Sequence, residues 1–117
     1  MRPGTDSMKQ LPLSPAAQAD LTEIKEYISQ DLEDPIAATS TASKIMAQIR
    51  SLSGQAFIGA PLSAIADIES DFRFLVSGNY LIFYRAYGAE VYIDRALYGR
   101  RDSLRILFDD MATAVEE

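Results

Sequence analysis

Neither cysteine nor histidine occurs among the 117 residues. Without cysteine the chain has no disulfide framework, no thiolate zinc site and no cysteine nucleophile, which suits a reducing cytoplasm. Without histidine no side chain titrates near neutrality at its ordinary pKa, so acid–base catalysis would need shifted carboxylates or tyrosines. The sequence also lacks a glycine-rich phosphate loop and a serine–histidine pair. We therefore expect no metal, no cofactor and no triad chemistry.

Long apolar runs are missing as well. No run approaches the roughly 18–20 residues that span a bilayer, and residues 1–7 contain no apolar signal-peptide core. We expect a soluble, cytoplasmic protein. Residues 1–7 precede a second methionine, Met8, and are interpreted as a vector-derived or disordered N-terminus. With 48% hydrophobic residues, the chain is expected to form one domain over residues 8–117 around one core.

The net charge is −6, and the charged residues are unevenly distributed along the chain. Residues 8–71 have four basic and nine acidic side chains, whereas residues 72–108 have six arginines, no lysine and three acidic side chains. Arginine is the residue best suited to bidentate contacts with carboxylate or phosphate. Any one arginine is more often an ordinary solvent-facing residue. The grouping nevertheless favours a binding site somewhere in this half of the chain, whose arginines are Arg73, Arg85, Arg95, Arg100, Arg101 and Arg105.

Three runs rich in β-branched and aromatic residues follow one another at 71–77, 80–86 and 90–98. Short connections that contain glycine join them, which predicts a three-stranded antiparallel meander. The central run is apolar at both alternating sets of positions. This pattern is expected of a strand that is covered on one side and flanked on both edges.

Two helices are predicted before the sheet. Residues 9–13 are a candidate for a short strand, with Pro12 favouring an edge position. Ser14 and Pro15 then give an N-cap followed by proline at the first helical position, which predicts a helix over 15–31. The same signal at Asp34 and Pro35 predicts a second helix to about residue 52. Both have an apolar stripe at helical spacing, so we expect a helical hairpin.

The remaining segments are a connection and a final helix. Residues 55–70 are interpreted as a long connection with one helical turn around 62–66. Asp102 is expected to cap a helix whose apolar stripe packs on its own domain or, alternatively, faces a partner. That stripe consists of Leu104, Leu107, Phe108, Met111 and Val115. The predicted single core between hairpin and sheet consists of Leu21, Ile24, Ile28, Ile45, Ile49, Val76, Ile82, Phe83, Val91 and Ile93.

This order of elements resembles the RelE/ParE superfamily, the toxins of bacterial type II toxin–antitoxin systems, often called plasmid stabilisation proteins. Three segments carry the resemblance, at residues 13–21 (LSPAAQADL), 78–85 (GNYLIFYR) and 94–102 (DRALYGRRD). It covers about residues 9–102. The resemblance implies an α+β fold, with a short N-terminal strand, a helical hairpin packed on an antiparallel sheet, and a C-terminal helix.

Departures from the family pattern decide which function is expected. Members often have tryptophan where Lys25 stands and histidine where Tyr98 stands. Family members that cleave messenger RNA on the ribosome use a lysine- and arginine-rich surface, and a polyanion-binding nuclease is expected to be basic. This chain is acidic and has no lysine in its sheet half. The resemblance therefore favours the ParE branch, whose members bind DNA gyrase and are neutralised by a cognate antitoxin.

The residues expected to contact a partner are Arg73, Arg85, Tyr98, Arg100 and Arg101. The alternative is a RelE-like, ribosome-dependent endoribonuclease, in which Arg73, Arg85, Tyr98 and Arg101 would be catalytic. A third possibility is an inactive family member that binds only its antitoxin. A dimer or a toxin–antitoxin hetero-oligomer is compatible with each of these.

Arg95 is expected to have a different role. It interrupts an apolar alternation formed by Val91, Ile93 and Leu97. An arginine among them must reach the end of the sheet or be partly covered beside a carboxylate. We predict that Arg95 is structural and paired with an acidic group of this chain or of an antitoxin.

Overall fold

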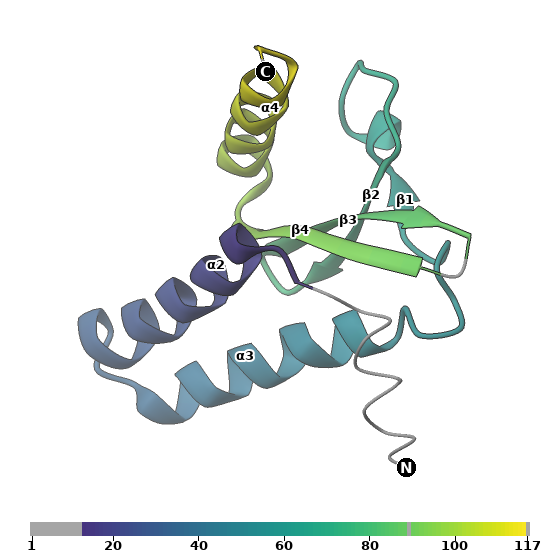
Figure 1. Cartoon of the computed structure of the whole chain (residues 1–117). Coiled ribbons are helices and arrows are strands. Elements are labelled where there is room, and N and C mark those ends of the chain that lie inside the picture. Colours follow the sequence, from purple (N-terminus) through teal and green to yellow (C-terminus); the bar gives the residue numbers. More distant parts are fainter. Residues whose placement is uncertain (1–12, 89, 117) are drawn as a thin grey trace.

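The computed structural model describes residues 13–88 and 90–116. The chain forms an α+β structure in which a helical hairpin is followed by an antiparallel sheet and a final helix (Figure 1). The elements are α2 (Pro15–Glu26), the π-helical turn η1 (Tyr27–Asp31), α3 (Pro35–Arg50), β1 (Ala60–Pro61), the 3-10 turn η2 (Leu62–Ala64), β2 (Phe72–Ser77), β3 (Tyr80–Tyr87), β4 (Glu90–Tyr98) and α4 (Arg100–Glu116).

The two hairpin helices begin at the predicted caps. The Ser14 hydroxyl accepts a hydrogen bond from the Ala17 amide at 2.9 Å, and the Asp34 carboxylate accepts one from the Ala37 amide at 3.0 Å. A proline follows each cap at the first helical position, where its missing N–H costs nothing. The first helix reaches residue 31 as predicted, but its last turn, η1, is π-helical.

The predicted meander is confirmed, and the sheet has one more strand. Its order is β1-β2-β3-β4, with all neighbours antiparallel. The additional strand β1 lies in the predicted connection, where Ala60 pairs with Phe74 of β2. The helical turn expected around 62–66 is present as η2.

The segment just before α2 pairs with the outer edge of β4. Leu13 forms a parallel bridge with Ile93, and the Ser14 amide donates to the Ile93 carbonyl at 2.9 Å. Of the strand predicted over residues 9–13, only Leu13 falls within the described residues. The contact matters because an unpaired edge strand can recruit foreign strands.

Both faces of the sheet are covered, which corrects the prediction of a single cover and a single core. The helical hairpin packs on one face, around Ile45, Ile49, Ile82, Tyr84 and Ile93. On the opposite face, Figure 1 shows α4 and the segment with η2 both rising from the sheet. There a second cluster forms from Leu62, Phe74, Leu81, Phe83, Leu97 and Leu107.

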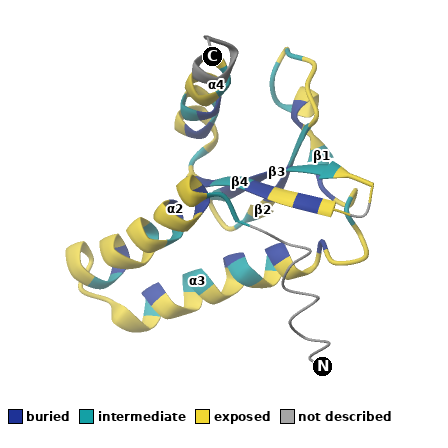
Figure 2. Ribbon diagram, in the orientation of Figure 1, coloured by how far each residue is buried: buried dark blue, intermediate teal, exposed yellow. Residues whose placement is uncertain are grey.

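Two residues of the predicted core are therefore misplaced. Phe83 is buried, but it belongs to the second cluster because it alternates with Ile82 along β3. Val76 is 51% exposed, since it lies near the end of β2 beyond the cover that α4 and η2 provide. Figure 2 shows the buried positions concentrated on the strands and on the sheet-facing sides of the helices.

The final helix packs on its own domain through Leu104, Leu107 and Met111. Phe108 is 37% exposed, and the side chain of Val115 lies outside the described residues. Among the helices that the structure describes, none combines the length and the apolar character needed to cross a membrane.

Candidate partner-binding site

A β-bulge in β4 decides where its arginine points. Phe83 of β3 faces Arg95, whereas the next residue, Tyr84, faces Ile93, so Asp94 is an extra residue in the strand. Such a bulge shifts the alternation of side chains from that point on. The sequence pattern placed Arg95 on the same face as Val91 and Ile93. Because of the bulge, it lies on the other face.

Arg95 lies at the sheet edge between α2 and α4. Its Nε and Nη2 donate to the two carboxylate oxygens of Asp20 at 2.7 and 2.8 Å, and its Nη1 donates to Asp110 at 2.9 Å. Asp20 also accepts the Ala96 amide at 3.0 Å and is only 6% exposed. The hydrogen bond with Asp20 raises the pKa of Arg95 further above its ordinary value. This network joins β4 to both helices.

Arg85 and Arg73 are also engaged within the chain. Arg85 donates two hydrogen bonds to Asp94, at 2.8 and 2.9 Å, and these raise the pKa of the guanidinium. Its guanidinium also lies 5.2 Å from the centre of the Phe72 ring. Arg73 donates to the carbonyls of Gly59 and Phe57, at 3.0 and 3.2 Å. Both arginines hold neighbouring segments in place.

The expected partner-binding residues do not form one site. Tyr98 pairs with Tyr80 at one end of β3, and Arg85 lies five residues further along that strand. At the usual rise per strand residue, Arg85 therefore lies about 16 Å along β3 from the position that pairs with Tyr98. Arg73 and Arg85 thus occupy one end of the sheet, and Tyr98, Arg100 and Arg101 the other.

A sharp turn between β4 and α4 places the second group. Gly99 has a φ of +77°, a conformation that favours glycine, and its amide donates to the Asn79 carbonyl at 2.8 Å. The chain therefore leaves the sheet abruptly, and α4 begins at Arg100. Arg101 and Arg105 are four residues apart and so lie on one side of the helix.

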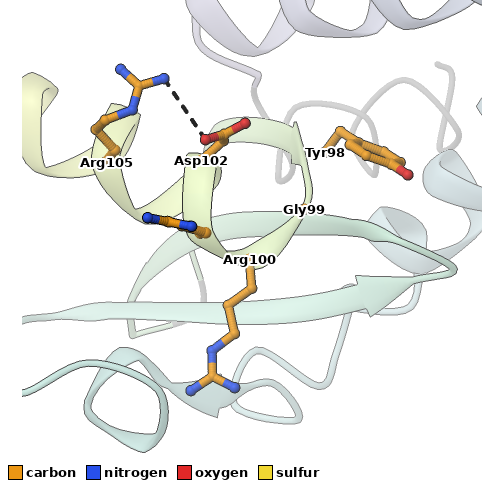
Figure 3. Close-up of a pocket in the computed structure, with 6 residues that line it drawn as sticks. Tyr98, Gly99, Arg100, Asp102 and Arg105 are labelled. Carbon is orange, nitrogen blue, oxygen red and sulfur yellow. Dashed lines mark ion pairs between the residues drawn. The ribbon is translucent and has the colours of Figure 1, made fainter.

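A shallow cavity of about 690 Å³ lies at the start of α4 (Figure 3). It is lined by Tyr98, Gly99, Arg100, Arg101, Asp102 and Arg105. We call Tyr98, Gly99, Arg100, Arg101 and Arg105 the arginine turn. Arg100 donates to the Ile65 carbonyl at 3.4 Å, while Arg105 lies 3.9 Å from Asp102, with both side chains largely exposed. In the described part of the chain, no carboxylate pairs with Arg100 or Arg101.

The arginine turn is suited to binding negative charge. Three guanidiniums lie at the N-terminal end of α4, where the helix dipole adds positive potential. The sequence analysis did not include Arg105 in the site, although its spacing from Arg101 on a predicted helix was the available signal. The side chains of the cavity lining that can give or take up a proton in the usual range are Tyr98 and Asp102.

Comparison with known proteins assigns the family. The family described as "ParE toxin of type II toxin-antitoxin system, parDE" matches residues 11–103, and the chain therefore belongs to the ParE toxin family. Membership in a toxin–antitoxin system implies a cognate antitoxin as partner. The departures at Lys25 and Tyr98 do not remove the chain from the family.

Solved structures agree on the fold. Among the 11 matching chains is one from a structure titled "Chromosomal ParDE TA system from P. aeruginosa". It superposes with a TM-score of 0.62 at 23% sequence identity, over 78% of this chain and 98% of that chain. A search of curated protein sequences finds no match.

Proposed function

We propose that this toxin inhibits DNA gyrase by binding it through the arginine turn, in the cytoplasm, and that a cognate antitoxin neutralises it. The observation that carries the proposal is the exposure of Arg100 and Arg101 without carboxylate partners among the described residues. Such guanidiniums are available to carboxylates of a protein target. Tyr98, which is 62% exposed, adds an aromatic side chain of the kind enriched at interface hot spots.

RNA cleavage is less well supported. The endoribonuclease alternative needs Arg73, Arg85, Tyr98 and Arg101 to act on one phosphate, whereas these residues occupy both ends of the sheet. Arg73 and Arg85 are held by contacts within the chain. The net charge of −6 also opposes binding to a polyanion.

A supercoiling assay with purified gyrase tests the proposal. We expect the full chain to inhibit supercoiling, and the Arg100→Ala, Arg101→Ala double variant to require at least about 10-fold more protein, as for loss of interface hot spots. Arg50→Ala removes an arginine that is also exposed, at the C-terminal end of α3, and is the matched control. It should inhibit like the unsubstituted protein.

A reconstituted translation system examines the alternative. Cleavage of messenger RNA that depends on the ribosome, with no effect on gyrase, would replace the proposal by the endoribonuclease. If the protein were inert in both assays yet bound its antitoxin, it would be an inactive family member.

A further inference from the structure

A second hollow adjoins the arginine turn on the side of the segment that contains η2. Its volume is about 670 Å³, and it is lined by residues 63–69 together with Arg100. We call it the loop hollow. Arg100 also lines the cavity of the arginine turn, and its Nη2 donates to the Ile65 carbonyl at 3.4 Å. The two hollows therefore meet at Arg100.

The backbone around the loop hollow is held by local hydrogen bonds and by apolar anchors. The Ile65 amide donates to the Leu62 carbonyl at 3.0 Å. The Ile68 amide donates to the Ala66 carbonyl at 2.9 Å. Leu62 is fully buried in the second cluster, and Ile65 and Ile68 pack against that cluster. The loop hollow is thus formed before a partner arrives, which lowers the entropic cost of binding.

Charge changes sign across Arg100. On one side Asp67 and Glu69 are exposed, and neither forms an ion pair in the part of the chain that the structure describes. On the other side Arg101 and Arg105 are exposed on α4. Figure 3 shows Arg100 and Arg105 leaving the start of α4 in different directions. The surface is therefore positive on α4 and negative beside the loop hollow.

We infer that the surface that contacts gyrase extends from the arginine turn across Arg100 into the loop hollow, and that the gyrase segment bound there carries both signs of charge. Its carboxylates face the arginine turn, and a lysine or arginine side chain enters the loop hollow beside Asp67 and Glu69. The inference deepens the proposed function and rests on it, because it specifies the chemistry of the segment that gyrase presents.

The lining of the loop hollow suits such a side chain. Ile65 and Ile68 offer apolar surface to the methylene groups of lysine or arginine, while the two carboxylates attract the charged end. A purely acidic segment is attracted by the arginine turn but repelled by Asp67 and Glu69. The charge pattern of the toxin therefore selects a segment of mixed charge over an acidic one.

The test compares two charge-reversal variants of the full chain for binding to immobilised gyrase by biolayer interferometry. Asp67→Lys with Glu69→Lys reverses the charge of the loop hollow, and we expect gyrase to bind this variant at least about 10-fold more weakly. Asp71→Lys with Glu90→Lys makes the same two replacements at exposed positions at the other end of the sheet. This control should alter affinity less than about 2-fold.

An isosteric variant separates charge from structure. Asp67→Asn with Glu69→Gln removes both charges and keeps the shapes of the side chains, so the segment should keep its fold. Its affinity for gyrase should fall by a smaller factor than that of the charge reversal, at least about 3-fold. Melting temperatures measured on all variants confirm that each is folded.

Photo-crosslinking reports contact independently of affinity. Because the chain contains no cysteine, a single introduced cysteine takes up a label at one chosen place. Ser63 is exposed and lines the loop hollow, so Ser63→Cys labelled with benzophenone maleimide should crosslink to gyrase on irradiation. Ser51→Cys places the same label at an exposed position after the end of α3 and should give only background.

The outcomes separate this inference from the proposed function. If Arg100→Ala with Arg101→Ala weakens binding to gyrase while both variants of Asp67 and Glu69 bind normally, the proposed function stands and the inference is overturned. Equal crosslinking from the labels at positions 51 and 63 would also overturn it. If the unsubstituted chain does not bind gyrase at all, the proposed function fails and the inference fails with it.

Discussion

Arg95 and Arg100 are five residues apart, yet their surroundings are opposite. Arg95 lies at the sheet edge, where its side chain is 18% exposed and bonded to two carboxylates. Arg100 begins α4 and is exposed, as is Arg101. The bulge at Asp94 and the turn at Gly99 separate these environments.

The difference teaches that residue type alone does not distinguish scaffold from site. A buried carboxylate such as Asp20 needs its cation, since removing that cation leaves an uncompensated charge. An exposed guanidinium without a carboxylate partner is well hydrated and contributes little to stability. We therefore expect substitutions at the sheet edge to change the free energy of unfolding, and substitutions in the arginine turn to change binding.

The largest effect is expected at the centre of the sheet, on which both regions rest. Ile82 is fully buried between the hairpin helices and the strands. Ile82→Asp buries a carboxylate without a partner, at a cost of several kcal/mol against a typical total of about 5–15 kcal/mol. We expect loss of the folded state by circular dichroism. An unchanged melting temperature would show that the central strand does not support the fold as described.

Arg95→Ala should have the next largest effect. It leaves the carboxylate of Asp20 buried without its cation, and we expect the free energy of unfolding to fall by about 2–4 kcal/mol. Arg85→Ala is the matched control, because its partner Asp94 is more exposed, at 19% against 6% for Asp20. The control should lose only about 1 kcal/mol. Urea denaturation measures both, and equal losses would remove the distinction between these pairs.

Tyr84→Phe tests whether a buried hydrogen bond of the scaffold contributes more to stability than an exposed one. The buried Tyr84 hydroxyl accepts the Gly59 amide at 3.0 Å, and any β-carbon at Gly59 would lie 2.6 Å from that hydroxyl. Removing the hydroxyl leaves a buried N–H without a partner and should cost about 1–2 kcal/mol in urea denaturation. Tyr92→Phe removes an exposed hydroxyl bonded to Glu90 and should leave stability unchanged. A stable Tyr84→Phe protein would contradict the role given to this bond.

The smallest change in stability is expected in the arginine turn. Arg100→Ala and Arg101→Ala should each alter the free energy of unfolding by less than about 0.5 kcal/mol. Chemical denaturation of the purified variants provides the measurement. A loss comparable to that of Arg95→Ala would mean that the turn also serves as scaffold.

Local signals made much of the fold predictable from the sequence. Serine or aspartate followed by proline marks the starts of α2 and α3, and glycine-containing connections between alternating runs mark the hairpins. The strand β1 was missed because Ala60 and Pro61 have no strand pattern of their own. They become a strand only through pairing with β2.

The candidate site was less predictable because its geometry depends on distant residues. The sequence indicated the arginines, but Arg95 and Asp20 are 75 positions apart, and no local pattern pairs them. The bulge at Asp94 likewise depends on register with β3. The hollow that Tyr27 and Tyr80 both line combines the end of a helix with strand ends, so only the folded chain brings these two residues together.

One paired measurement tests the division between scaffold and site most directly. Thermal stability and gyrase inhibition are measured on Arg95→Ala and on the Arg100→Ala, Arg101→Ala double variant under the same conditions. The account predicts that Arg95→Ala melts at a lower temperature while its folded fraction still inhibits, and that the double variant melts normally but inhibits at least about 10-fold more weakly. An Arg95→Ala protein of normal stability, together with a double variant that inhibits fully, would contradict it.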